Sequence, residues 1–179
     1  MGANSFMDST FKVGDRAVYP AQGVAEIVSI ETKEISGNSE VFYILEVLNS
    51  EKRIMIPVSK VASVGLRDVI TRKDAAEVFT VLKERDVRID NTTWNRRYRR
   101  YLDKIKSGEI TEVAEVLRDL YILKEDKPLS FGERKMLDTA RELLVQELSV
   151  SRGVTDETVL DELRDIFGDD EPLIDDLDI

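Results

Sequence analysis

TRKDAAEVFTVL, residues 71–82, is the stretch in which the hydrophobic pattern of the chain changes from strand-like to helical. Its apolar residues Ala75, Val78, Phe79 and Leu82 fall at i, i+3, i+4 and i+7, the spacing of one helix face. Residues 11–66 instead hold short runs rich in strand-forming residues. The sequence therefore predicts an α+β chain of two domains.

The N-terminal domain is expected to be a small β-barrel. Turn signals at residues 20–23, 36–38 and 49–50 separate the strand-like runs. The predicted strands include Arg16–Tyr19, 24–30, 41–48 and Arg53–Pro57. Short strands at this spacing indicate a barrel of SH3 or Tudor type over residues 11–68. The small, polar residues 1–10 are predicted to be disordered.

Residues 69–168 are expected to form an all-α domain of about five helices. After the helix that begins near Thr71, the pattern predicts helices at 93–106, 110–124, 131–152 and 156–167. Ser130 and Glu133 form a Ser-x-x-Glu capping box, and Gly153 lies just past the end of the helix that this box opens. Residues 169–179, with six acids and no base, are predicted to be a disordered acidic tail.

Composition argues against catalysis. The 179 residues include no cysteine and no histidine, which removes disulfides, thiolate nucleophiles, the usual general base and the commonest metal ligand. No P-loop, dinucleotide-binding fingerprint or metal-ligand cluster is present. We therefore expect no enzyme activity, no cofactor and no metal. No apolar run approaches the roughly 18 residues of a membrane span, so the expected location is the cytoplasm.

The formal net charge of −10 is unevenly distributed. Residues 155–179 hold eleven acids and one base, whereas the first 154 residues hold 25 of each. The low overall pI is therefore a weak argument against nucleic-acid binding.

The most cationic segment surrounds TWNRRYRRY, residues 93–101, which contains the only tryptophan. Residues 88–106 hold seven bases and two acids. A basic helix with interleaved aromatic residues is typical of a surface that contacts phosphates. An ordinary solvated charged face is the alternative, and the pattern alone leaves both open. The candidate DNA-binding residues are Trp94, Arg96, Arg97, Arg100 and Lys104.

Trp94 admits two interpretations. Its helical stripe continues through Tyr98, Tyr101, Leu102 and Ile105, which is the pattern of a core-facing side. We expect Tyr98, Leu102 and Ile105 to be buried. Because Trp94 lies in the first turn, its indole is expected either to pack on the core or to project. A projecting indole can wedge into a minor groove at an unstacked base step.

The edge of the barrel can also be interpreted in two ways. Lys33 and Ile35 lie just before the 36–38 turn, and Met55 lies in a short strand. An edge strand offers unpaired backbone groups to a partner sheet, so these residues are candidates for a docking surface. The alternative is that Ile35 and Met55 are simply buried.

Several motifs carry a family resemblance. They are FKVGD (11–15), VYP (18–20) with Gly23, RIMIP (53–57), VGLRDV (64–69), TWNRRY (93–98), AEVLRDL (114–120) and LSFGERKML (129–137). In this order they resemble the CarD/CdnL family of bacterial transcription regulators over residues 11–167. The CdnL branch is the closer match, because no long basic low-complexity extension follows the helices. The first domain also resembles the polymerase-interacting domain of transcription-repair coupling factor.

The resemblance implies a non-enzymatic regulator that bridges RNA polymerase holoenzyme and promoter DNA. The barrel would dock on the polymerase β subunit through an edge that includes Lys33, Ile35 and Met55. The chain is expected to be a monomer associated with the nucleoid.

The resemblance also implies roles for the basic helix. Trp94 would wedge into the minor groove at the upstream edge of the transcription bubble and so stabilise the open promoter complex. Arg96, Arg97 and Arg100 would hold backbone phosphates. The alternative function is a protein–protein adaptor whose basic helix binds an acidic protein instead of DNA.

Overall fold

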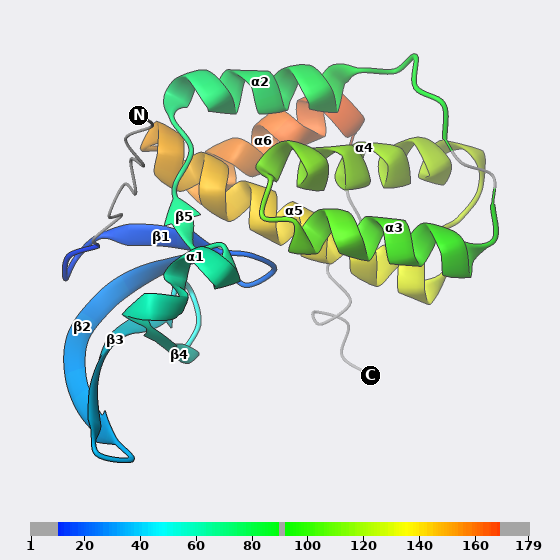
Figure 1. Cartoon of the computed structure of the whole chain (residues 1–179). Helices are drawn as coiled ribbons and strands as arrows, with labels where there is room; N and C mark the ends of the chain where they lie inside the picture. Colours follow the sequence, from blue (N-terminus) through cyan, green and yellow to red (C-terminus); the bar gives the residue numbers. More distant parts are fainter. Residues whose placement is uncertain (1–10, 90–91, 169–179) are drawn as a thin grey trace, which may run out of the picture.

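The chain forms an antiparallel sheet followed by a group of helices (Figure 1), and this computed structural model describes residues 11–89 and 92–168. The strands are β1 (Arg16–Tyr19), β2 (Gly23–Ile35), β3 (Asn38–Val47), β4 (Arg53–Pro57) and β5 (Arg67–Asp68). The helices are α1 (Val61–Val64), α2 (Arg72–Lys83), α3 (Trp94–Lys106), α4 (Ile110–Asp126), α5 (Phe131–Arg152) and α6 (Asp156–Phe167). The predicted two-domain α+β fold is confirmed. The disorder expected for residues 1–10 and 169–179 concerns segments outside the described residues.

The five strands are ordered β4-β3-β2-β1-β5, and every neighbouring pair is antiparallel. β1 and β4 have the predicted bounds, but β2 and β3 are longer than predicted. Ser36 and Gly37 have φ angles of 53° and 80°, as a tight two-residue hairpin turn requires. The β2–β3 ladder therefore continues to the pair Ile35 and Asn38 at the tip of the hairpin.

A compact apolar core lies against one face of the sheet. Ile27, Tyr43, Leu45 and Ile56 are buried there, on neighbouring strands. The backbone N–H of Phe11 donates to the Tyr43 hydroxyl at 3.1 Å, and the two rings pack edge to face. Within the described part of the chain the ladder does not close into a ring, since β4 and β5 remain its edges.

Helix α5 is the centre of the helical domain. Its N-cap Ser130 accepts a hydrogen bond from the backbone N–H of Glu133 at 3.3 Å, and Gly153 ends it with a φ of 65°. Both ends agree with the prediction. The fully buried leucines of the core come from α2, α4, α5 and α6, and they include Leu82, Leu117, Leu120, Leu137, Leu144, Leu148 and Leu163.

Thr155 caps α6 as predicted, since its hydroxyl accepts from the backbone N–H of Thr158 at 3.2 Å. At the other end of α6, the ring of Phe167 stacks on Tyr121 of α4 with centroids 4.2 Å apart. None of the described helices is both long enough and apolar enough to cross a bilayer.

Leu144 has no exposed surface. We predict that Leu144→Ala lowers the free energy of unfolding by about 2–5 kcal/mol, because it removes buried methyl groups and leaves a cavity. Urea denaturation followed by circular dichroism measures this change. Lys73→Ala, on the exposed side of α2, is the control and should alter stability by less than about 0.5 kcal/mol. Similar losses in the two variants would refute the central place of α5 in the core.

Candidate nucleic-acid interface

The N-terminus of α3 lies at the end of the helical domain that is remote from the sheet (Figure 1). Tyr101 and Ile105 hold the helix on the core, and both are buried. The prediction for Ile105 is therefore confirmed, and Leu102 is partly buried against the same core. The prediction for Tyr98 is wrong, because its side chain is 41% exposed.

Trp94 is half-buried, and its indole lies on the first turn of α5. A Cβ atom at Gly132 would stand 3.2 Å from the indole Nε1 and 3.3 Å from Cζ2, which is tighter than ordinary contact. The missing side chain at Gly132 therefore gives the indole its seat. The two interpretations of Trp94 are compatible, since one face packs on α5 while part of the ring stays accessible.

Two further aromatic residues surround this seat. Tyr98 packs against Trp94 at an interplanar angle of 64°, with centroids 5.5 Å apart. Phe131, the residue before Gly132, is 69% exposed, the largest fraction among the exposed large apolar residues. Phe131 was not among the residues expected at this surface. A large aromatic residue directly after a helix N-cap, before the buried residues of the helix begin, was the available signal.

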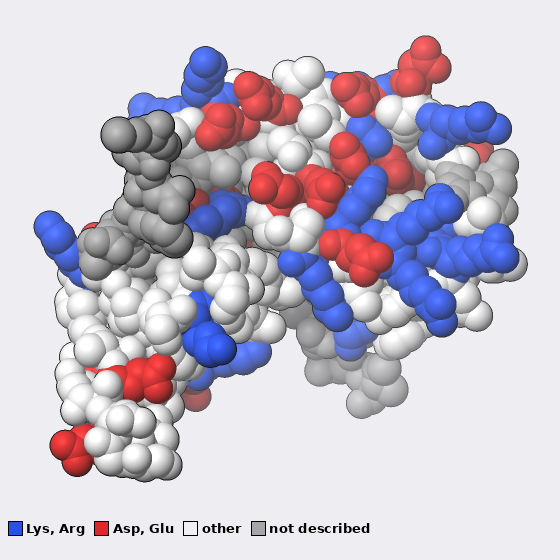
Figure 2. Space-filling view, viewed as in Figure 1, with Lys and Arg blue, Asp and Glu red and all other residues white. Residues whose placement is uncertain are grey.

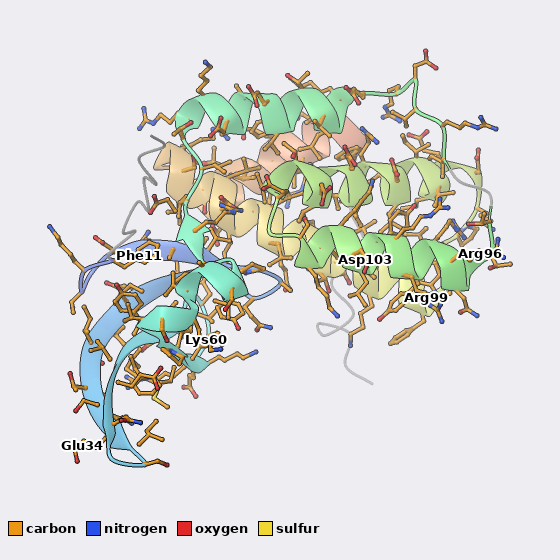
Figure 3. All side chains as sticks on the ribbon, in the orientation of Figure 1. Phe11, Glu34, Lys60, Arg96, Arg99 and Asp103 are labelled. Carbon is orange, nitrogen blue, oxygen red and sulfur yellow. The ribbon has the colours of Figure 1, made fainter. Side chains whose placement is uncertain are left out.

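Basic side chains gather over this end of α3. Figure 2 shows the cluster on the visible face, and Figure 3 shows Arg96, Arg99 and Asp103 along the helix. Arg96, Arg99 and Arg100 are all exposed. Two of the five predicted DNA-binding residues, Arg96 and Arg100, therefore lie on an accessible cationic surface next to Trp94. Arg99 extends that surface.

Arg97 does not lie on that surface, contrary to expectation. It is only 7% exposed, and its guanidinium carbon lies 5.8 Å from the centre of the Trp94 ring. Its Nη2 is 3.5 Å from Oε1 of the buried Glu133. The reason is helical geometry. Arg97 is three residues after Trp94 and four before Tyr101, so it shares their side of the helix, which faces α5. Arg97 thus stacks near the indole and is withdrawn from solvent.

Lys104, the fifth candidate, is partly buried and is engaged within the chain. Its Nζ lies 2.6 Å from Oε2 of Glu115 on α4, so its charge is largely balanced there.

Beneath α3, burial raises the pKa of Tyr101 to about 12, and the negative charge of Asp119 contributes to the rise. Burial likewise raises the pKa of Asp119, although the neighbouring Arg118 guanidinium opposes that rise. Both groups belong to the support of the helix and not to the accessible surface.

The candidate polymerase-binding residues share one face of the sheet. In the register, Lys33 is opposite Glu40, Ile35 is opposite Asn38, and Met55 is opposite Ile44. Their three partners on β3 are separated by even numbers of positions, so all three side chains lie on the same side of the sheet. Ile35 and Met55 are each 50% exposed, so the alternative that they are buried is excluded. They do not form one tight cluster, because the partners of Lys33 and Met55 are four positions apart along β3, roughly 13 Å.

Comparison with known proteins assigns both domains. Residues 11–70 match the family described as "CarD-like/TRCF RID domain", and residues 77–164 match "CarD, C-terminal domain". "Putative transcription factor YdeB" of Bacillus subtilis (strain 168) is 39% identical over 152 residues, which covers 83% of this chain and 97% of that protein. The solved structure "CdnLNt from Myxoccoccus xanthus" is 52% identical, covers 36% of this chain and 90% of that chain, and has a TM-score of 0.31.

A polymerase-interacting β-domain joined to a CarD-type helical domain defines a class of two-domain bacterial transcription regulators. The chain belongs to the CarD/CdnL family within that class. The resemblance drawn from the motifs is therefore confirmed. Membership of this family indicates that the protein is an RNA polymerase-interacting transcription factor.

Gly132 offers a direct test of the indole seat. We predict that Gly132→Leu displaces Trp94 from α5 and shifts its fluorescence emission to longer wavelength, because the displaced ring meets more water. Trp94 is the only tryptophan, so the emission reports this site alone. Lys135→Leu, at an exposed position one turn further along α5, is the control. An unchanged spectrum in folded Gly132→Leu would show that the indole does not rest on Gly132.

Proposed function

We propose that this protein stabilises the open promoter complex by bridging RNA polymerase and DNA. The sheet edge formed by β4, with the face that carries Lys33, Ile35 and Met55, binds the polymerase β subunit. The N-terminal half of α3 contacts promoter DNA at the upstream edge of the transcription bubble, where Trp94 enters the minor groove. The protein acts by binding and performs no chemical step.

The seating of Trp94 on α5, at the end of α3 that carries the exposed arginines, is the observation that carries this proposal. The indole rests on α5 at Gly132, with Arg97 5.8 Å from its ring centre, so its position is set before DNA arrives. A preorganised aromatic ring loses little conformational freedom on binding, and this favours affinity. A flat apolar ring suits a base step that is already unstacked, as at the edge of a bubble.

The arginines have a different role from the tryptophan. Arg96, Arg99 and Arg100 are exposed on the first turns of α3, where they can contact phosphates. Phosphate contacts set the orientation of a protein on DNA without reading the sequence. Three such contacts give weak binding to free DNA that falls steeply with salt.

Polymerase binding supplies the remaining affinity. A protein held on the β subunit meets upstream DNA at a high effective concentration, so weak DNA contacts suffice. The exposed apolar side chains of Ile35 and Met55, together with the backbone groups along β4, offer the surface that such docking needs.

Trp94→Ala should shorten the lifetime of the open promoter complex toward its value without the protein. Trp94→Phe, which keeps a smaller flat ring, should retain part of the effect. The measurement is the decay of open complexes formed by cognate holoenzyme after addition of a competitor. Because Trp94 is only half-buried, the variant should keep most of its stability. A loss of roughly 3–5 kcal/mol, the cost of truncating a fully buried tryptophan, would count against the wedge.

Arg96→Gln combined with Arg100→Gln should reduce the slope of log K for DNA binding against log salt by about 1.8, since each lost phosphate contact removes about 0.9. Arg164→Gln on α6 is the control, as it removes one positive charge from a different helix. Fluorescence anisotropy with labelled duplex DNA gives the slope. An unchanged slope, with polymerase binding intact, would reject DNA contact by α3 and favour a protein adaptor whose basic helix meets an acidic partner.

A further inference from the structure

The junction between the two domains holds a buried charge that neither interface uses. Glu147 on α5 has a side chain that is only 2% exposed. Its carboxylate accepts hydrogen bonds from Nη1 and Nη2 of Arg67 at 2.7 and 2.8 Å, and from the backbone N–H of Ile70 at 3.0 Å. Arg67 belongs to β5, an edge strand of the sheet that lies beside the helical domain in Figure 1. A charge so deeply buried is tolerated only with such complete pairing.

The same arginine reaches a third element. Its Nε donates to the carbonyl of Gly108 at 2.7 Å, in the turn between α3 and α4. One guanidinium therefore joins β5, α5 and the turn that follows α3. Because the guanidinium is planar and its donors have a set geometry, it specifies the orientation of these elements as well as their proximity.

The neighbouring residue, Gln146, makes a second connection with both ends of its amide. Its Oε1 accepts from the backbone N–H of Val24 at 3.1 Å, and its Nε2 donates to the carbonyl of Leu48 at 3.0 Å. These bonds tie α5 to the start of β2 and to the end of β3. A Cβ atom at Gly23 would lie 2.3 Å from that Oε1, so only glycine permits the contact.

The β1–β2 turn packs into the same junction. A Cβ atom at Gly65 would be 3.3 Å from Cγ of Pro20, and one at Gly108 would be 3.2 Å from the same atom. Pro20 thus touches a glycine from each domain. The segment from Pro20 to Gly23 is therefore placed against the helical domain and not on the sheet face that carries Met55.

We propose that Arg67, Gln146 and Glu147 form an interdomain latch that holds the polymerase-binding face and Trp94 at one set separation and orientation. The inference rests on the proposed bridging function. These are positioning residues, because they lie outside both of the proposed contact surfaces. With the latch closed, docking of the sheet delivers Trp94 to one place on the DNA. With the latch open, the helical domain would rotate about the residues between β5 and α2. Trp94 would then sample many orientations, and its effective concentration at the DNA site would fall.

The latch predicts a variant that binds both partners but no longer stabilises the open complex. Gln146→Ala is the mild variant, and Arg67→Met combined with Glu147→Met removes both charges, so neither is left buried and unpaired. Arg164→Met combined with Asp161→Met removes an exposed ion pair on α6 and is the matched control. Circular dichroism and melting establish that each variant is folded.

Two readouts distinguish the latch from a purely structural role. Nitroxide labels at Glu51→Cys and Lys127→Cys report the separation of the domains by pulsed electron resonance, since the chain has no other cysteine. The expected result is a narrow distance distribution in the wild type and in the control, and a broad one in the latch variants. Affinity for polymerase and for free DNA should be unchanged, while most of the open-complex lifetime extension is lost.

Two results would overturn the latch. One is a narrow distribution in folded latch variants, and the other is a broad distribution with a full lifetime extension. If the wild-type protein itself gives no lifetime extension, the proposed function fails. The distance measurement then still decides whether these residues hold the domains together, but their positioning role for open-complex stabilisation is rejected.

Discussion

The ion pair between Arg67 and Glu147 determines how the rest of the molecule is arranged. A carboxylate with almost no contact with water needs its donors. Arg67 supplies two of them from the sheet, and Ile70 supplies a third from the segment between β5 and α2. Any arrangement that moves β5 from α5 leaves a buried charge without partners, which is costly. From Glu147, α5 runs fifteen residues back to Gly132, about 22 Å of helix. One straight element thus carries both the domain junction and the seat of the indole.

The basic helix illustrates how similar residues acquire different roles. Arg96, Arg99 and Arg100 point into solvent, whereas Arg97 is buried beside Glu133 and the indole. That pair is not fully satisfied within the described residues, because Nε of Arg97 and Oε2 of Glu133 have no hydrogen-bond partner. Burying an imperfectly paired ion pair contributes little to stability. Its contribution is better understood as holding the ring in place, with the exposed arginines left to meet phosphates.

The sequence predicted features that depend on local chemistry. Caps at Ser130, Thr155 and Gly153, and the change of period at residues 71–82, placed the helices correctly because they act over one turn. The rotation of α3 about its own axis could not be predicted from local sequence, because it depends on contacts with other helices. The helical wheel placed Tyr98 on the buried side, whereas packing against α4 and α5 buries Arg97 and leaves Tyr98 41% exposed. The exposure of Phe131 and the pairing of Glu147 likewise depend on elements far apart in the chain.

The open edge of β4 also affects the tendency of the free protein to self-associate. Backbone groups along an unpaired edge accept any extended segment, including the same strand of a second copy. Charges border this strand, with Glu51 and Lys52 before it and Arg53 at its start, where the guanidinium lies 3.4 Å from Glu46. In antiparallel self-pairing centred on Met55, each Arg53 would lie opposite Pro57 of the second copy, which has no backbone N–H to donate. The edge is therefore selective, poorly suited to its own copy and open to a strand that brings complementary charge.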